Sequence, residues 1–250
     1  MTLAQQEINR TANMKYVIRR RPSRVRLLLL AFLFIAASAG FTAQRTRAAV
    51  SFGLPLAGEP SLSTWFVVQW YGNTTTAYRN RDSLYRQGQG IHFGVDFAAR
   101  CGTPVLAIAD GIVVAVDGPY GAPPHNVVIE HANGLRSLYG HLLERSPLAI
   151  GQHVQKGQQI GLVGDPATPI CHSASHLHLE IRDRSMSHAI NPVTVIPADW
   201  RRLTLGLGGD GTHFEVPYQQ PNQWQTIDDQ PTIRFGGPLL NDWTDAWPPR

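Results

Sequence analysis

The sequence predicts a mainly β fold in which antiparallel sheets form a groove. Short apolar segments rich in β-branched and aromatic residues recur between clusters of Gly, Pro and Asn. The pair Asn133-Gly134 stands between two such segments and is typical of a β-hairpin with a two-residue turn. Little sequence is left for long helices. With 250 residues, 43% of them hydrophobic, the chain can bury the core of one catalytic domain with extensions at its ends.

Residues 1–43 are predicted to be a signal peptide or a signal anchor. Five arginines between residues 19 and 26 precede the apolar run 27–37, and small residues follow at 37–39. Met14 is an alternative start. Cleavage is favoured because the apolar stretch 27–43 is shorter than the roughly 20 residues that span a bilayer. We therefore expect an exported monomer that is extracellular, cell-wall-associated or periplasmic, with membrane contact only through an uncleaved anchor.

The charge of the chain argues against nucleic-acid binding. Residues 1–43 hold seven of the 22 basic residues and one of the 18 acidic residues, so the remainder is slightly acidic. No Lys/Arg patch with interleaved aromatics follows the leader.

The remaining elements are predicted in chain order from turn signals and β-forming segments. Residues 44–64 are expected to be a spacer, 65–200 the catalytic domain and 201–250 a C-terminal extension that straps onto the surface or is partly disordered. The expected strands are 65–70, 105–109, 112–116, 127–131, 135–141, short turning strands within 151–161, and the segment from 176. Long polar loops are expected at 72–90 and 118–124, as possible walls of a substrate groove.

Two short stretches carry the chemistry. Successive strand residues point to opposite faces, so a strand through residues 92–97 would present His92 and Asp96 opposite Phe93, Val95 and Phe97. In the second stretch, 176–182, the apolar Leu177, Leu179 and Ile181 alternate with His176, His178, Glu180 and Arg182. Each strand would therefore pack one face on the core and line a polar groove with the other.

These side chains suit a catalytic zinc site. Such sites usually have three His, Asp or Glu ligands and one open position. His92, Asp96 and one histidine of the pair His176 and His178 would supply the three ligands. A zinc-activated water suits amide hydrolysis, and the spare histidine could move the proton, with His141 as a second candidate.

Cys101 and Cys171 follow the first stretch and precede the second. In an oxidising compartment we expect them to form a disulfide that clamps the two segments together. Two buried thiols and metal ligation are the alternatives.

Several motifs in order resemble the M23 family of zinc metallopeptidases, the lysostaphin and LytM-like peptidoglycan endopeptidases. They are His92-x-x-x-Asp96, Gly102-Thr103-Pro104-Val105, Asp110-Gly111-Ile112-Val113, Tyr139-Gly140-His141-Leu142, His176-Leu177-His178-Leu179-Glu180 and the closing Asn191-Pro192. The resemblance covers roughly residues 65–195.

The resemblance implies a LytM/lysostaphin-type (duplicated hybrid motif) catalytic domain that cleaves peptide bonds in peptidoglycan crosslinks or stem peptides. It also implies that His92, Asp96 and His178 hold one Zn²⁺ per chain, while His141 and His176 are catalytic. The family uses a tyrosine upstream of the first ligand to stabilise the oxyanion, and Tyr85 and Tyr78 are both candidates.

Two other functions compete with this one. A non-catalytic LytM-like module that binds the wall or activates another hydrolase would typically lack a ligand or a catalytic histidine, and this chain lacks none. A biotinyl or lipoyl carrier would need a lysine at an exposed turn, and the residues around Lys156 do not match that pattern. Among the other histidines, His131 is expected to support the hairpin, and the rest are expected to be structural or exposed.

Overall fold

The computed structural model describes residues 50–166, 171, 174–207, 213–217 and 219–243. The predicted signal segment lies outside these residues. No helix in the described part is long and apolar enough to cross a membrane. The described residues belong to one compact unit that begins at Arg47.

Antiparallel β structure dominates this unit, as the sequence predicts. The strands are β1 Trp65–Gln69, β2 Val95–Ala99, β3 Pro104–Leu106, β4 Gly111–Val116, β5 His125–Glu130, β6 Arg136–Leu142, β7 His153–Val154, β8 Gln159–Leu162, β9 His176–Arg182, β10 His188–Ile190 and β11 Ile233–Arg234. The helices are short: α2 Thr75–Arg79 and the 3-10 helices η2 Arg86–Gly88, η3 Pro192–Thr194 and η4 Arg202–Thr204.

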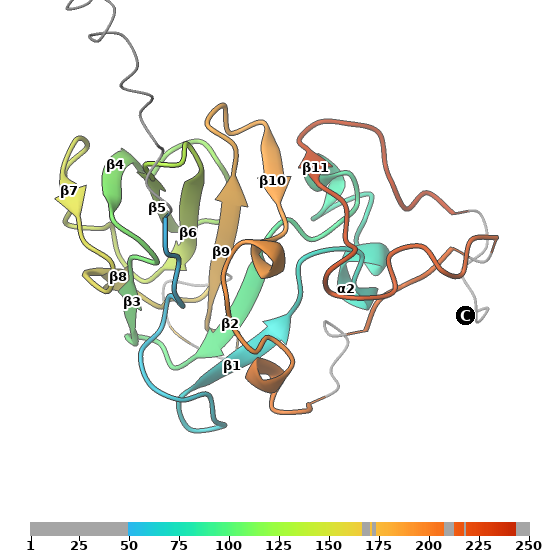
Figure 1. Ribbon diagram of the computed structural model, residues 1–250, viewed down its shortest axis with the longest axis horizontal. Helices are drawn as coiled ribbons and strands as arrows, with labels where there is room; N and C mark the ends of the chain where they lie inside the picture. Colours follow the sequence, from blue (N-terminus) through green and yellow to red (C-terminus); the bar gives the residue numbers. More distant parts are fainter. Residues whose placement is uncertain (1–49, 167–170, 172–173, 208–212, 218, 244–250) are drawn as a thin grey trace, which may run out of the picture. The chain divides into compact units, whose positions relative to one another are not determined.

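One sheet carries most of the strands in the described residues. Its order is β1-β2-β9-β6-β5-β4-β7, and β10 joins β9 and β11 beside it (Figure 1). A second sheet pairs β3 with β8. β2 and β9, which carry Asp96 and His178, are therefore neighbours although 82 residues separate these two side chains in the sequence.

The hairpin β5–β6 turns differently from the prediction. His131 N–H donates to the Leu135 carbonyl at 2.9 Å, which leaves three residues in the loop rather than two. Only Gly134 has a left-handed backbone there, with φ +81°. A three-residue hairpin loop with a left-handed glycine at its end is the next most common solution after the two-residue turn.

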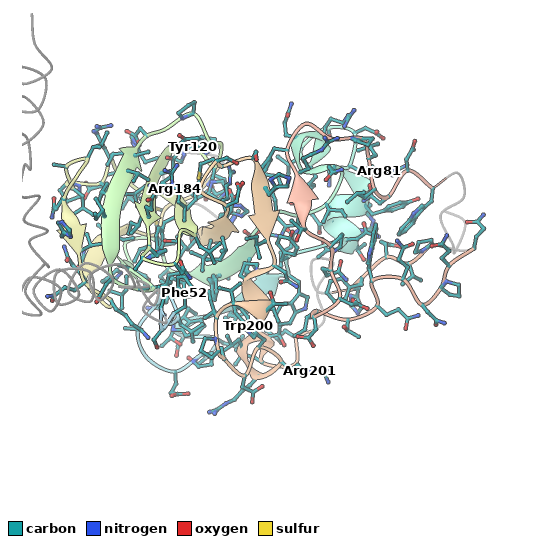
Figure 2. All side chains as sticks on the ribbon, turned by 45° about the horizontal axis from the view of Figure 1, so that its top comes forward. Phe52, Arg81, Tyr120, Arg184, Trp200 and Arg201 are labelled. Carbon is teal, nitrogen blue, oxygen red and sulfur yellow. A yellow bond between two sulfur atoms is a disulfide. The ribbon has the colours of Figure 1, made fainter. Side chains whose placement is uncertain are left out.

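The core lies on one side of the sheet. Leu177, Leu179 and Ile181 of β9 are fully buried in it, as their alternation predicts. Phe97 packs its ring edgewise on Trp65 and at 6.2 Å from Trp200, whose position is marked in Figure 2. Burying aromatic side chains of this size supplies much of the stability of a domain.

The opposite side of the hairpin is covered by a smaller cluster. Val128 and Leu138 pack there against Met186, with Tyr120 and Ala122 at its margin. The loop that carries Tyr120 and Ala122 is thereby held over the sheet, next to the predicted ligands.

The segments expected to lie outside the domain also contact it. In the predicted spacer, Phe52 and Leu56 are buried in the main core. In the C-terminal extension, β11 pairs with β10, and Asn241 is fully buried. The division of the chain at residues 65 and 200 stays a prediction.

Candidate active site

His92 stands in a short bridge just before β2. Its backbone exchanges two hydrogen bonds with Gly72, at 2.9 and 3.0 Å. Its side chain is buried, and Nδ1 donates to the Trp70 carbonyl at 2.6 Å. Because the proton is held on Nδ1, the lone pair of Nε2 is directed toward Asp96 and His178.

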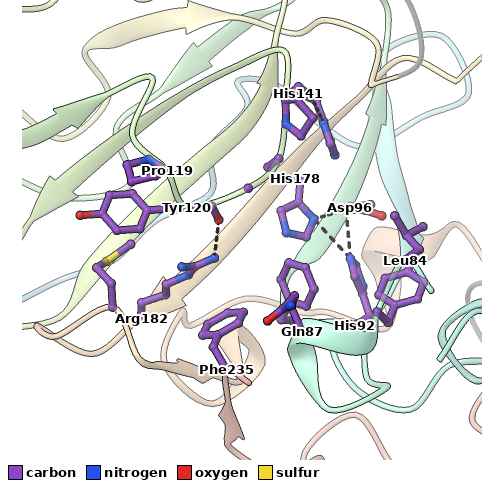
Figure 3. A pocket seen from close by; sticks show the side chains of 16 residues that line it. Leu84, Gln87, His92, Asp96, Pro119, Tyr120, His141, His178, Arg182 and Phe235 are labelled. Atoms are coloured by element: carbon purple, nitrogen blue, oxygen red, sulfur yellow. Dashed lines mark hydrogen bonds and ion pairs between the residues drawn. The ribbon is translucent and has the colours of Figure 1, made fainter. Parts of the chain in front are cut away.

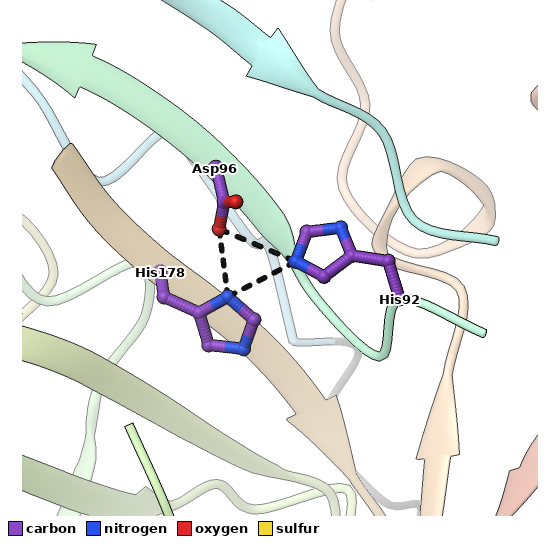
Figure 4. A group of neighbouring side chains, drawn as sticks. All are labelled: His92, Asp96 and His178. Carbon is purple, nitrogen blue, oxygen red and sulfur yellow. Dashed lines mark hydrogen bonds and ion pairs between the residues drawn. The ribbon is translucent and has the colours of Figure 1, made fainter. Parts of the chain in front are cut away.

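Asp96 and His178 are directly opposite each other in the β2–β9 register. Asp96 Oδ1 lies 2.7 Å from His178 Nδ1 and 3.3 Å from His92 Nε2, and the two ring nitrogens are 3.3 Å apart (Figure 4). A Cβ on Gly94 would lie 2.6 Å from the His178 ring, so only glycine leaves room for this approach. The structure thus brings three buried ligand atoms together as a candidate metal site.

The donor set fits zinc. Two imidazole nitrogens and one carboxylate oxygen are the ligands of catalytic zinc sites, with the fourth position left open. His178 Nε2 is buried without a well-directed hydrogen bond in the described residues, and its nearest charged neighbour is Glu180 Oε1 at 3.3 Å. A carboxylate on the far side of a histidine ring is the usual partner of a metal ligand.

The charges of the cluster stabilise each other. Burial alone would raise the pKa of Asp96, but His92, His176 and His178 hold it well below its usual range. Burial would lower the pKa of His178, but the carboxylates of Asp96 and Glu180 raise it to about 9. Asp96 is therefore a carboxylate at neutral pH, as a metal ligand must be.

His141 and His176 lie beside the three ligand residues. Their rings are 4.8 Å apart, centroid to centroid, and the His141 ring is 5.6 Å from that of His178. His176 Nε2 is 3.8 Å from Asp96 Oδ2. The structure thus brings all five predicted site residues together; their roles stay predictions.

His141 is held in a left-handed backbone conformation with φ +56°, which costs a non-glycine residue about 1–2 kcal/mol. Its N–H donates to the Ala122 carbonyl, and its carbonyl accepts from Gly164 N–H. Its Nδ1 donates to the Pro123 carbonyl. Burial, helped by the neighbouring His178 and His176, lowers the pKa of His141 to about 4, so its ring is neutral at pH 7.

A cleft of about 530 Å³ opens over these residues (Figure 3). Its lining is largely apolar. One wall is the loop 119–123, the other comes from residues 84–93, and Phe235 lies beside Arg182. The two loops predicted as groove walls thus both line the cleft.

Of the two tyrosine candidates, Tyr85 lines the cleft. Its ring lies edgewise on His92, at 5.6 Å, and its hydroxyl donates to Gln69 Oε1 at 3.2 Å. Tyr78 is stacked on Trp243 and is not among the residues of the cleft.

The predicted strand through residues 92–97 is wrong in its first half. β2 begins only at Val95, so strand alternation does not determine where Phe93 points, and this side chain lies only at the margin of the core. Its ring instead contacts His178 edgewise at 5.5 Å and lines the cleft. The alternation fails because His92 pairs with Gly72 in a single isolated bridge, and residues 90–94 are not part of a strand.

Some residues of the cleft could not be assigned from the sequence. Arg182 could have been suspected, because the alternation of β9 already placed it on the same face as His178. Phe235 of the cleft, and Gln69, which accepts a hydrogen bond from Tyr85, carry no sequence signal that links them to the site. Their proximity depends on contacts between segments far apart in the chain.

Two other expectations are confirmed. Cys101 and Cys171 form a disulfide with Cα atoms 5.8 Å apart. His131 supports the hairpin: it is buried, and its two ring nitrogens bond to the Asp110 carbonyl and to Ser137 Oγ, at 2.9 and 2.8 Å.

Comparison with known proteins agrees with the geometry. Residues 90–192 match the family described as Peptidase family M23. The DD-carboxypeptidase/endopeptidase Mpg of Neisseria meningitidis is 42% identical over 105 residues, which cover 42% of this chain and 23% of that protein. The peptidoglycan DD-endopeptidase ShyA of Vibrio cholerae is 40% identical over 91 residues, covering 36% of this chain and 20% of that protein.

Among solved structures, the catalytic domain of lysostaphin from Staphylococcus simulans is 28% identical and has a TM-score of 0.40. The overlap covers 52% of this chain and 90% of that one. The chain spans less than a quarter of the length of these two curated relatives.

Proposed function

We propose that this chain, whose residues 90–192 form a domain of the M23 peptidase family, is a zinc endopeptidase that cleaves peptide bonds of peptidoglycan outside the cytoplasm. The observation that carries the proposal is the convergence of three buried ligand atoms and His141 on one apolar cleft, with His176 beside His141 and Asp96.

His92, Asp96 and His178 would hold the zinc through Nε2, Oδ1 and Nδ1. A zinc ion bound there supplies Lewis acidity and lowers the pKa of water to about 7. The protein's part is to keep Asp96 ionised, which the neighbouring histidines do, and to orient the ring of His92, which the Trp70 carbonyl does from outside the site.

His141 and His176 would handle the proton. The Nδ1–H of His141 is fixed by the Pro123 carbonyl and that of His176 by the Ala174 carbonyl, at 2.6 Å for the latter. Each ring therefore keeps its Nε2 as the atom that can accept a proton. Because His141 is neutral at pH 7, it can accept the proton of the attacking water and return it to the leaving amine.

Tyr85 is the proposed donor to the oxygen of the scissile carbonyl. Burial and the negative charge of Asp96 raise the pKa of its phenol, which keeps the hydroxyl protonated. A donor of this kind contributes only if it reaches the charge that develops in the transition state. The Tyr85 hydroxyl would take this role by giving up its hydrogen bond to Gln69 and donating to the oxygen of the scissile carbonyl instead.

Peptidoglycan peptides are the proposed substrate because two relatives carry names of peptidoglycan or DD-peptide cleavage. The apolar lining formed by Leu84, Phe93, Pro119 and Phe235 suits the alkyl side chains of short peptides better than charged groups.

The test is digestion of purified cell walls by the purified chain, with the released fragments identified by mass spectrometry. New peptide amino termini should appear with wild-type protein and not with His178→Ala. Intact peptides with both proteins would refute endopeptidase activity and favour the alternative, a non-catalytic wall-binding module, which a pull-down on the same walls would detect.

A further inference from the structure

Glu180 is a buried carboxylate that the proposed chemistry leaves without a role. It lies on β9 two residues after His178, on the same face, and is fully buried. An ionised carboxylate in such a position is costly unless it is paired. Its neighbours are His178 Nε2, at 3.3 Å from Oε1, and the guanidinium of Arg182, which donates to both carboxylate oxygens.

Arg182 is itself held from two further sides. Its Nη2 donates to the Tyr120 carbonyl at 2.9 Å. Its guanidinium carbon lies 4.1 Å from the centre of the Phe235 ring, within the range of a cation–π contact. The side chains of His178, Glu180 and Arg182 thus form one continuous row that ends on Phe235; Figure 3 shows Arg182 and Phe235 at the end of this row.

Phe235 is fixed in place by the C-terminal extension. It follows β11, which pairs with β10, and its N–H donates to the Ser187 carbonyl at 3.0 Å. Its ring also contacts Phe93 edgewise at 5.4 Å, and Phe93 in turn contacts His178. The C-terminal extension is therefore linked to His178 by two sets of contacts, one through Arg182 and Glu180 and one through Phe93.

We propose that Glu180 is a positioning residue for His178, and that the C-terminal extension supports it through Phe235 and Arg182. The inference rests on the proposed zinc site. When Nδ1 of His178 serves as a ligand, the ring proton must be on Nε2, and Glu180 Oε1 is the acceptor placed to hold it there. Arg182 donates two hydrogen bonds to Glu180 and holds its carboxylate beside the ring, and Phe235 covers the guanidinium.

The first test measures zinc affinity by competition with a chromophoric chelator, without any assay of activity. Glu180→Gln should weaken zinc binding by about 10- to 100-fold, the usual effect of losing such a partner. The double variant Glu180→Leu/Arg182→Met removes both charges, so no buried charge is left without a partner. A loss of zinc binding in this variant cannot then be attributed to misfolding caused by an unpaired charge. The double variant should show the same loss while unfolding in urea as a single transition.

The matched control is Glu130→Gln. Glu130 is also a strand glutamate paired with arginines, Arg136 at 2.7 Å and Arg184 at 3.0 Å, but it does not contact the candidate zinc ligands. The zinc affinity of the Glu130→Gln variant should stay within about twofold of wild type. A folded Glu180 double variant with wild-type zinc affinity would overturn the inference.

The second test concerns the C-terminal extension. Phe235→Ala should weaken zinc binding in the same direction as Glu180→Gln but less, and should shift the visible spectrum of the Co²⁺-substituted protein. Phe214→Ala removes another aromatic side chain of the extension, one that packs on the main core, and should leave that spectrum unchanged. Identical spectra for wild type and Phe235→Ala would refute the role of the extension.

These outcomes separate the inference from the proposed function. If the wild-type protein binds no zinc, the proposed function fails. If wild type binds zinc and the Glu180 variants bind it equally well, only the positioning role fails.

Discussion

Replacing His141 by alanine should abolish most activity and leave zinc bound. The ring lies next to the three ligand residues without being one of them, and its Nε2 is the atom free to accept a proton. General acid–base catalysis contributes about 10²- to 10⁴-fold, so kcat should fall by that factor, equivalent to about 3–5 kcal/mol of transition-state stabilisation.

The contact between the two rings sharpens this prediction. His141 and His176 are 4.8 Å apart, centroid to centroid, and would act on the same reaction. Residues that act as a unit show strongly non-additive losses, so the double variant His141→Ala/His176→Ala should be little worse than the more damaging single variant.

The assay is release of fragments from purified cell walls, with bound zinc measured on the same samples. His153→Ala is the control, because His153 is an exposed residue of β7 and does not line the cleft. Full activity of the double variant would refute the assignment of these histidines. Loss of zinc from His141→Ala would show that it is a ligand instead.

Three further predictions follow from the structure. Because the pKa of His178 is raised to about 9, the His178 ring of the zinc-free protein carries a proton below that pH, and zinc must displace it. Zinc affinity should therefore fall about tenfold for each pH unit of acidification. Calorimetry at pH 7 in buffers of different ionisation enthalpy should detect about one proton released on zinc binding. Replacing Cys101 and Cys171 by serine should cost about 2–5 kcal/mol of unfolding free energy in urea, because the bond closes a loop with a sequence separation of 70. Phe97→Ala should cost about 3–5 kcal/mol in the same assay, because the ring is fully buried.

Each of these has a contradicting result. Zinc affinity that does not change with pH would show that His178 is already neutral. An unchanged urea midpoint for the cysteine variant would show that the disulfide does not constrain the unfolded chain. An unchanged midpoint for Phe97→Ala would show that the site collapses without leaving a cavity.

The sequence predicted the fold class and the resemblance to the M23 family, and both are confirmed. The prediction worked best in β9, because one face of that strand is uniformly apolar and the other uniformly polar. It worked less well before β2. There the backbone leaves the strand at residues 90–94, and alternation alone could not place Phe93.

The remaining parts of the site depend on long-range contacts that have no local signature. Phe235 approaches Arg182 only because β11 pairs with β10, and a two-residue strand leaves almost no pattern in the sequence. Tyr85 and Tyr78 could not be told apart because both lie in the same polar loop, and only the packing of that loop directs Tyr85 to His92.

Reconstitution with zinc tests the central claim most directly. Protein stripped with a chelator and dialysed should be inactive on purified cell walls, and activity should rise linearly with added Zn²⁺ to a plateau at about one equivalent per chain. Asp96→Asn should show no such plateau. Full wall-cleaving activity of the stripped protein, with no zinc detected by elemental analysis, would contradict the account.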